Sequence, residues 1–470
     1  MGKKHKVPQF ARTDAGNAEM FAHISSGDLR FDHKQRRWLT WSGNWWSVAA
    51  GGEIMGRAKD VARMRADTAQ RLGGEEKDAE TNWALNSESL ARLEAMVKLA
   101  QGEAPLSDSG EGWDSDPMLL GVANGVIDLR TGILRDGKPE DKITLHSDIA
   151  YDPNATCPRF TEFIFEVFEG DSELIEFVHR AIGYCLTGNT KEQCLFACQG
   201  GGSNGKSTLL EVNRFILGGY AYNLPFSAFE LDKRSSIPND LAPLPGKRFI
   251  TAIETNESAK LNEGRIKLLT GCDPISARFM RREFFTFVPV GKYWLSFNNP
   301  PMVMDSSHGF WRRVRIIPFR KQFDGSEVDD KLLEKLKAEA PGILNWAVQG
   351  CLKWQETGLG IPPAIQLATQ AYREECDPLA EFIEEYCVIG PEEKVEVGLL
   401  LDKYIGWASD NFERPISRKD FTKRLVAKGF KKKKHGKNGT WTWFGIGLTS
   451  ANTTEMTLML TTQSGGRERT

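Results

Sequence analysis

Residues 200–208 carry a pattern that binds the phosphates of a nucleotide. An apolar segment, 194–198, is predicted to be a buried strand before it, and 208–210 opens an apolar helix after it. The pattern G-x-x-x-x-G-K-[ST] is matched at every fixed position, and its glycines let several backbone N–H groups face one phosphate at a helix N-terminus. Lys206 is predicted to neutralise the β- and γ-phosphates, and Ser207 to ligate Mg²⁺. The predicted cofactor-binding residues are Gly200, Gly201, Gly202, Ser203, Asn204, Gly205, Lys206, Ser207 and Thr208. The flanking strand and helix disfavour the alternative, a chance glycine-rich turn.

Two other predicted strands are each followed directly by a polar side chain. Glu254 follows an apolar strand over 247–253, and a carboxylate there can hold Mg²⁺ or orient the attacking water. Asn298 follows a strand over 291–297, and its amide can hold that water or sense the γ-phosphate. Each residue has a simpler alternative: a glutamate that caps a strand, and a plain Asn-Pro turn.

Arg312 and Arg313 stand directly before another apolar strand, predicted over 314–319. An arginine here could reach the γ-phosphate of a neighbouring subunit as a trans-acting finger, because its rigid charged fork suits phosphate. A solvated basic strand start is the alternative, and the segment alone does not decide between them.

These four segments, in this order, resemble the superfamily-three DNA helicases, and are most similar to the phage, plasmid and poxvirus primase-helicase family. The segment 267–278 resembles that family's extra motif between the acidic strand and the sensor strand. Upstream, 124–132 and 151–153 resemble its helicase-associated N-terminal domain, and 372–379 resembles its linker before the last domain. The resemblance covers about residues 10–445.

The resemblance implies an α/β fold with a P-loop, AAA+-like helicase core, an α+β N-terminal associated domain and a C-terminal winged-helix domain. It implies that Lys206 and Ser207 bind ATP and Mg²⁺, that Glu254 is the second acidic motif, and that Asn298 is the sensor. Arg313 is then the better finger candidate and Arg312 the second. The family forms hexameric rings around DNA and typically moves 3′ to 5′.

The sequence departs from that family in three places. Thr255 follows Glu254 where many relatives have a second acid, so metal binding and water activation are not clearly separated. Cys272 replaces a glycine that is common there, which leaves the local turn open. About 190 residues precede the phosphate loop and match the helicase-associated region, so we expect no primase domain, and a separate primase or polymerase as a partner.

A basic segment over 278–287 is predicted to form two short strands around a tip that contacts DNA. In the resembled family a hairpin here projects into the ring channel. Arg278, Arg281 and Arg282 are predicted to grip phosphates, and Phe279 to stack on bases or sugars. The other aromatic residues of this segment, Phe284, Phe285 and Phe287, are expected in the core.

The segment 417–446 is predicted to form the helix and wing of a winged-helix domain. Ser417 can cap a helix with Asp420, and Phe421 and Leu425 lie one turn apart on its inner face. The residues expected outside this helix are Arg418, Lys419, Lys423, Arg424 and Lys428. A basic strand of Lys431, Lys432, Lys433 and Lys434 follows, with Lys437 in the turn after it. Helix and wing suit phosphate contacts, and a solvated charge run is the alternative.

Five regions follow from these patterns. An N-terminal region (1–110) contains a strand over 37–41 and a helix over 79–99, and a collar-like domain (111–190) contains a hairpin over 123–132 and helices over 158–186. The ATPase core (191–360) ends in a helical stretch from 329, and the winged-helix-like domain (361–446) precedes a disordered tail (447–470).

Composition fits an ordinary globular protein. Hydrophobic residues make up 40% of 470 and the net charge is −2, so a local basic patch rather than global charge must carry any nucleic-acid contact. The sequence contains no apolar run of membrane-spanning length, and eight scattered cysteines favour reduced thiols in a cytoplasmic protein.

The leading hypothesis is an ATP-dependent DNA helicase of phage or plasmid replication, in the bacterial host cytoplasm if it is phage-borne. Its expected partners are single-stranded and forked DNA and further copies of itself, and no membrane partner is expected. An ATP-dependent origin-binding or loading factor is the second hypothesis. A small-molecule kinase is the third, and the paired basic segments argue against it.

Overall fold

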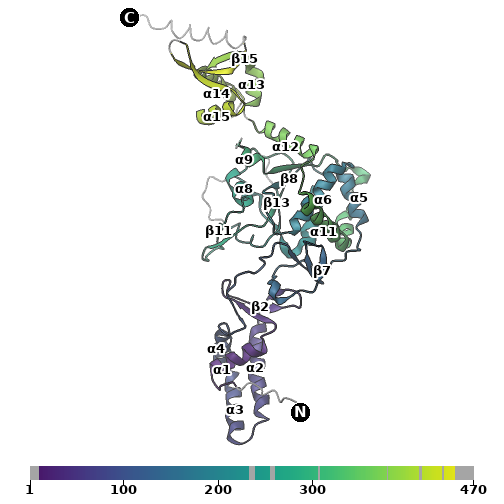
Figure 1. Ribbon diagram of the computed structural model, residues 1–470, viewed down its shortest axis with the longest axis vertical. Helices are drawn as coiled ribbons and strands as arrows, with labels where there is room; N and C mark the ends of the chain where they lie inside the picture. Colours follow the sequence, from purple (N-terminus) through teal and green to yellow (C-terminus); the bar gives the residue numbers. More distant parts are fainter. Residues whose placement is uncertain are drawn as a thin grey trace, which may run out of the picture.

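The computed structural model describes residues 10–231, 239–254, 260–304, 307–377, 379–411, 415–436 and 439–449. Thr255, Lys437 and residues 450–470 of the expected tail lie outside the described residues. The chain is elongated, with a helical N-terminal part, a central α/β body and a small C-terminal part arranged along one axis (Figure 1). Within the described residues, no helix is long and apolar enough to cross a membrane.

The N-terminal part packs four helices beside a four-stranded sheet of order β3-β2-β1-β4. Its elements are α1 Asp14–Ile24, β1 Leu29–Asp32, β2 Arg37–Trp41, β3 Trp46–Val48, α2 Glu53–Ala69, α3 Gly74–Ser87, α4 Leu90–Ala100 and β4 Ser107–Asp108. The strand predicted over 37–41 is confirmed, and the helical stretch predicted over 79–99 is confirmed except for a break at 88–89, between α3 and α4. Ser89 occupies the N-cap position of α4 with extended backbone (φ −64°, ψ 144°), which separates the two helices.

Residues 111–190 form a three-stranded antiparallel sheet followed by two helices. The elements are β5 Leu119–Val122, β6 Gly125–Asp128, β7 Ile133–Arg135, η1 Pro139–Asp141, α5 Pro158–Val167 and α6 Ser172–Leu186. The predicted turns at 124–125 and 131–132 join β5 to β6 and β6 to β7. A Cβ on Gly183 of α6 would lie 2.1 Å from the backbone nitrogen of Cys351, so glycine permits a close approach of two helices there.

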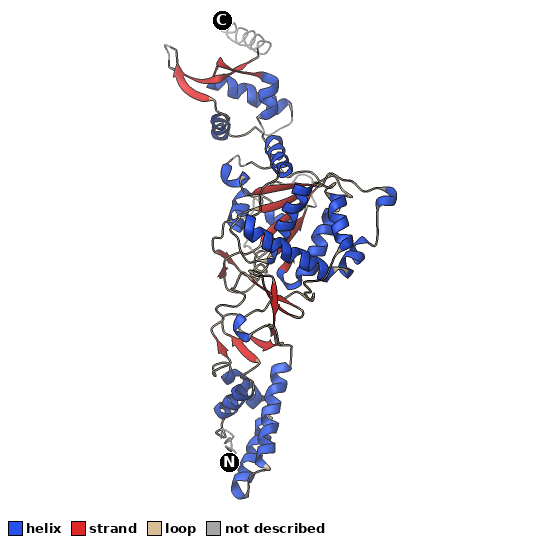
Figure 2. Cartoon of the chain, turned by 45° about the vertical axis from the view of Figure 1, so that its right-hand side comes forward, coloured by secondary structure: helices blue, strands red, loops and turns tan. Residues whose placement is uncertain are grey.

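The central body contains a five-stranded parallel sheet of order β14-β8-β13-β10-β9. Its strands are β8 Leu195–Gln199, β9 Ala221–Asn223, β10 Phe249–Ile253, β13 Lys292–Phe297 and β14 Val314–Pro318. Successive residues of β8 pack into two different hydrophobic cores, Phe196 into one and Ala197 into the other. Both faces of the sheet are therefore buried, and Figure 2 shows its strands enclosed by helices. A mixed α/β architecture with a parallel sheet is confirmed.

Helices, a hairpin and short 3-10 turns surround this sheet. They are α7 Lys206–Leu217, η2 Gly218–Tyr220, η3 Phe226–Phe229, α8 Glu263–Thr270, β11 Ile275–Ala277, β12 Phe285–Phe287, α9 His308–Trp311, η4 Gly325–Glu327, α10 Leu332–Ala338, α11 Ala340–Thr357 and α12 Pro363–Glu375. α12 packs on β14: the Thr369 hydroxyl accepts from the Ile316 N–H at 3.2 Å, and the Tyr372 hydroxyl donates to the Pro301 carbonyl. The eight cysteines form no disulfide.

The C-terminal part has its own core around Tyr404, Phe421 and Trp443. Its elements are α13 Ala380–Tyr386, β15 Cys387–Glu396, α14 Val397–Asp410, α15 Arg418–Ala427, β16 Lys431–His435 and β17 Thr440–Leu448, with sheet order β15-β17-β16. The Ser417 hydroxyl accepts from the Asp420 N–H at 3.2 Å, as the predicted cap requires. β17 runs two residues into the segment that the sequence assigned to the tail.

Arg424 is a correction within α15. The sequence placed it outside the helix with the other basic residues, but its side chain is buried. Its guanidinium donates to the Met304 carbonyl at 2.5 Å and lies 3.6 Å from the Asp377 carboxylate. The helical spacing was read correctly, but Arg424 faces the central body, and spacing alone does not show where a neighbouring domain docks.

Candidate nucleotide-binding site

The loop between β8 and α7 has the backbone that a phosphate-binding turn needs. Gly202 and Gly205 have positive φ (98° and 82°), a conformation that side chains disfavour. A Cβ on Gly205 would lie 2.7 Å from Val167 and 3.0 Å from the Phe163 ring, both on α5. Glycine is therefore required at this position, both by its backbone conformation and by the close packing of α7 on α5.

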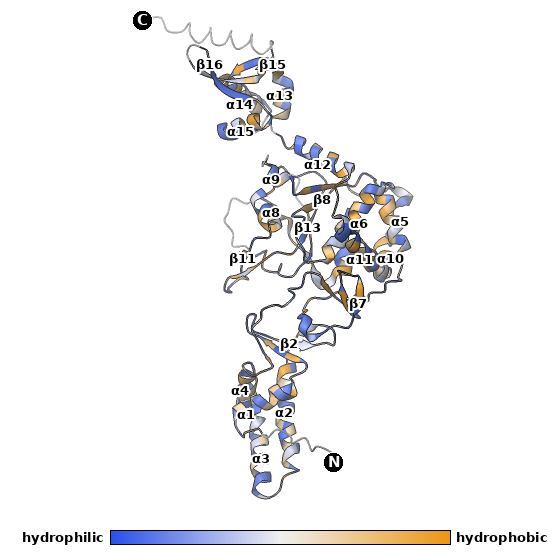
Figure 3. Cartoon of the chain, viewed as in Figure 1, coloured by the Kyte–Doolittle hydropathy of each residue, from blue (hydrophilic) through white to orange (hydrophobic). Residues whose placement is uncertain are grey.

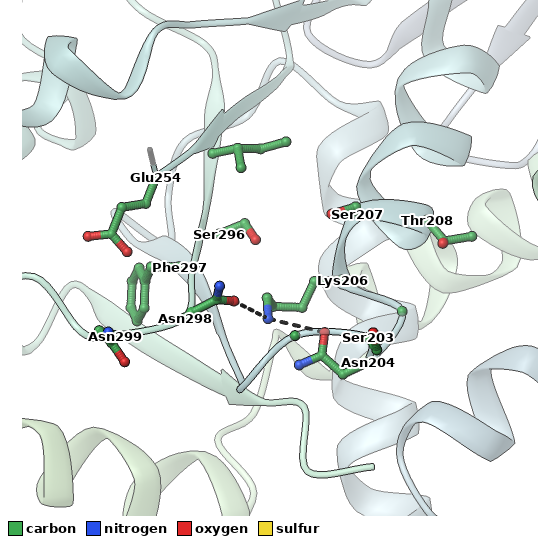
Figure 4. A pocket seen from close by; sticks show the side chains of 13 residues that line it. Ser203, Asn204, Lys206, Ser207, Thr208, Glu254, Ser296, Phe297, Asn298 and Asn299 are labelled. Carbon is green, nitrogen blue, oxygen red and sulfur yellow. Dashed lines mark hydrogen bonds between the residues drawn. The ribbon is translucent and has the colours of Figure 1, made fainter. Parts of the chain in front are cut away.

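Lys206, the first residue of α7, points its amine back across this loop. The amine donates to the Gly200 carbonyl at 2.5 Å and to the side-chain oxygens of Asn204 and Asn298, both at 3.1 Å (Figure 4). The side chain is 5% exposed, and burial lowers the pKa of Lys206. All three acceptors are neutral oxygens, so they compensate the ammonium less well than an anion would. The position favours a negatively charged ligand.

Asn298 and Glu254 come to this loop because three parallel strands end at one edge of the sheet. β13 lies between β8 and β10: Phe297 is paired with Gln199, and Ser296 with Ile253. The Glu254 N–H donates to the Ser296 carbonyl at 2.8 Å. Asn298 and Glu254, far from the loop in the sequence, therefore lie beside it in the structure.

These groups line one cavity of about 470 Å³, a volume typical of a small-molecule site. Figure 4 shows Glu254 and Asn298 on the side opposite Ser207 and Thr208. The lining residues are Gly202, Ser203, Asn204, Gly205, Lys206, Ser207, Thr208, Ile253, Glu254, Ser296, Phe297, Asn298 and Asn299. Of the predicted loop residues, Gly200 and Gly201 stand outside this lining.

Two oxygen-bearing side chains of this cavity could bind Mg²⁺, but they are too few for a metal site made of protein ligands alone. Ser207 is exposed at the start of α7, and the half-buried Glu254 lines the same cavity. Across the described part of the chain, three or more His, Cys, Asp or Glu side chains nowhere gather as a metal site. Mg²⁺ commonly takes one or two protein oxygens together with phosphate and water oxygens, which these two residues fit.

Arg312 and Arg313 do not reach this cavity within one chain. The Leu195 N–H donates to the Arg313 carbonyl at 2.9 Å. Arg313 therefore lies level with the start of β8, at the end of the strands opposite the cavity. Its guanidinium donates to the Thr270 hydroxyl at 3.2 Å and to the Gly309 carbonyl. Burial, and secondarily the charge of Arg312, lowers the pKa of Arg313. Arg312 is exposed and donates to the Gln193 side chain at 2.9 Å.

Cys272 occupies a turn that favours glycine. Its φ is 66°, in the left-handed region, which answers the question that the sequence left open. Its thiol donates to the Thr190 hydroxyl at 3.0 Å. This contact ties the turn after α8 to the segment before β8.

The predicted basic hairpin forms between β11 and β12, which pair antiparallel. Arg281 and Arg282 are exposed at its tip, Arg278 is half-buried, and Phe279 is 43% exposed. Phe284 was expected in the core, but it is 57% exposed, and the Arg278 guanidinium lies 4.7 Å from its ring centre. Phe285 and Phe287 pack partly against the core. Alternation along β12 points these two inward and leaves Phe284, before the strand, outside.

The predicted basic residues of the C-terminal part form a surface on two elements. Arg418, Lys419 and Lys423 are exposed on α15. β16 appears as a hydrophilic strand in Figure 3 and carries Lys431, Lys432, Lys433 and Lys434, of which Lys432 is half-buried. Trp441 of β17, which was not among the predicted site residues, is 48% exposed beside these lysines. Trp441 shares a strand face with the buried Trp443, so alternation along β17 predicts burial and gave no signal of its exposure.

Comparison with known proteins gives two family matches. Residues 18–169 match a family described as "D5 N terminal like", and residues 198–313 match a family of unknown function (DUF5906). The second match spans the phosphate loop, Glu254 and Asn298 and ends at Arg313.

Several curated relatives are viral proteins. A "Putative helicase" of Acanthamoeba polyphaga mimivirus is 30% identical over 299 residues, which cover 58% of this chain and 31% of that protein. A "Putative helicase" of Frog virus 3 is 24% identical, covering 64% of this chain and 40% of that protein. A "Putative primase" of African swine fever virus is 25% identical, covering 63% and 34%. The matches span less than half the length of these relatives.

Among solved structures, the apo form of the NrS-1 C-terminal region (305–718) covers 88% of this chain and 87% of that one. The two are 11% identical, with a TM-score of 0.47.

Proposed function

Since the chain is a member of the D5-type primase-helicase family, we propose that it is an ATP-dependent DNA helicase. It would unwind duplex DNA during phage or plasmid replication as a hexameric, ring-shaped motor with an AAA+-like core and a winged-helix C-terminal domain. The observation that carries this proposal is the Lys206 amine, held 3.1 Å from the Asn298 side-chain oxygen in a cavity that Glu254 also lines.

These residues divide the work of ATP hydrolysis. Lys206 would exchange its neutral acceptors for oxygens of the β- and γ-phosphates, and the N–H groups of the loop would hold the same phosphates. Glu254 would accept a hydrogen bond from the attacking water, and Asn298, already beside the amine, would hold that water in line. Ser207 and Glu254 would hold Mg²⁺, which neutralises charge developing on the phosphates.

ATP hydrolysis can separate DNA strands only if a conformational change at the nucleotide site moves residues that contact the DNA. The exposed arginines of the β11–β12 hairpin, Arg281 and Arg282, are proposed to grip backbone phosphates, with Arg278 beside them. The hairpin follows α8, and α8 also supplies the Thr270 hydroxyl that holds Arg313. A nucleotide-dependent shift of Arg313 would therefore move the base of the hairpin.

A second candidate is an ATP-dependent origin-binding or loading factor that uses the same cavity as a switch. The basic surface of α15 and β16, which suits duplex phosphates, favours it. The two candidates share the cavity but differ in whether turnover separates strands.

Strand displacement on forked duplexes, measured beside DNA-stimulated phosphate release, tests the proposal. Wild-type protein should unwind with ATP and Mg²⁺. Lys206→Ala should lose turnover and unwinding while circular dichroism stays native, because the main charge on the phosphates is gone. Turnover with DNA binding but no unwinding would favour the loading factor. A folded Lys206→Ala protein with near-normal turnover would overturn the site itself.

A further inference from the structure

The ladder between β16 and β17 places two lysines and two tryptophans on one face. Lys434 is paired with Trp441, and Lys432 with Trp443. Paired residues of an antiparallel ladder share a face, and so do residues two apart on one strand. The carboxylate-bearing Glu396 of β15 pairs with Thr442 and so belongs to the opposite face.

The two tryptophans of this face differ in burial. Trp443 is 0% exposed and belongs to the C-terminal core, whereas Trp441 is 48% exposed. Trp443 therefore accounts for the packing of the ladder on α14 and α15. The indole of Trp441 lies beyond that core and presents a large flat apolar surface to solvent.

The ammonium groups of two lysines lie close to this indole. The amine of Lys432 lies 5.4 Å from the Trp441 ring centre and the amine of Lys434 lies 5.8 Å from it. Their backbone positions are about 7 Å apart, two strand residues. Lys431 and Lys433, exposed on the opposite face, add further positive charge to the same strand. An exposed apolar ring with cations close to it is complementary to a base, which can stack on the ring, and to the phosphates next to that base.

We propose that Trp441, Lys432 and Lys434 form a binding site for one unpaired nucleobase of single-stranded DNA. The indole stacks on the base, and the two ammoniums meet the phosphates on either side of it. The inference rests on the proposed function, which supplies single strands at a fork. The new element is a contact on the C-terminal domain that holds a displaced single strand. This contact is separate from the duplex contacts proposed for α15.

Binding of fluorescently labelled oligothymidylate and of a duplex of equal length, measured by anisotropy over a range of salt concentrations, tests the site. Trp441→Ala should weaken single-strand binding about five- to 150-fold, since a base–aromatic stack contributes about that factor. Trp441→Phe should retain most of the affinity. Ile389→Ala, at a residue that is 64% exposed on β15 of the same domain, is the matched control and should bind as wild type does.

Salt dependence separates stacking from charge. Trp441→Ala should leave the slope of log affinity against log salt unchanged, because stacking releases no counterions. Lys432→Ala with Lys434→Ala should flatten that slope by roughly 0.7 for each phosphate lost. Duplex binding by Trp441→Ala should stay near wild type.

Unchanged single-strand binding by a folded Trp441→Ala protein would overturn the site and leave the helicase proposal standing. Equal losses on single strand and duplex would also overturn it. Wild-type protein that binds neither DNA would overturn the helicase proposal, and this site with it.

Discussion

Replacing Arg313 with alanine should abolish ATP turnover in a way that a second subunit can repair. Arg313 lies level with Cys194, and Gly200 begins the phosphate loop six residues further along. At about 3.3 Å per residue, the two ends of this strand segment are roughly 20 Å apart. An arginine side chain cannot cover that distance, so any contact between Arg313 and a γ-phosphate must come from a neighbouring chain.

The expected size of the effect follows from the chemistry of such fingers. Losing one costs roughly a thousandfold or more in turnover. The lost contacts of Arg313 to Thr270 and Gly309 should by themselves cost only about 1–3 kcal/mol of folding stability. Arg313→Ala protein should therefore remain folded but nearly inactive.

Mixing two inactive variants tests whether Arg313 acts on the nucleotide bound by a neighbouring chain. Arg313→Ala keeps an intact phosphate loop, and Lys206→Ala keeps an intact arginine, so mixed assemblies contain interfaces with both. Phosphate release should reappear on mixing, and Arg312→Ala is the companion variant. If sizing confirms hetero-assembly and no turnover returns, Arg313 acts within its own chain or only structurally, and Arg312 becomes the residue to test.

Three other predictions concern charge and docking. Replacing Lys431 and Lys433, on the strand face opposite Trp441, with alanine should flatten the salt dependence of duplex binding by up to about 1.8 in slope, and an unchanged slope would count against duplex phosphate contacts by β16. Burial lowers the pKa of Lys292 to about 7 from 10.5. Between those values the unfolded chain binds more protons than the folded one, so the free energy of unfolding should rise by about 2 kcal/mol from pH 7 to 9. Lys292→Met should lack this rise in denaturant titrations, and an equal rise in both proteins would refute the assignment. Arg424→Ala should loosen the docking of α15 by about 1–3 kcal/mol and speed proteolysis near Asp377, whereas Lys423→Ala, at an exposed neighbour, should not.

Short-range sequence patterns account for the local structure of this protein. The phosphate loop, its strand and its helix follow from short-range rules: glycines where φ is positive, a lysine at the first helical position, and an apolar run on each side. The hairpin turns at 124–125 and 131–132 and the Ser417 cap follow in the same way, because a few adjacent residues settle such geometry.

Tertiary structure decided which distant residues meet and which side chains face solvent. Strand order places β13 between β8 and β10, and this brings the Asn298 oxygen to the Lys206 amine. Helical spacing put Arg424 outside, but the docked central body buries it. Phe284 and Trp441 are exposed although both side chains are apolar. Exposure and strand order depend on packing between segments far apart in the chain, which local spacing does not encode.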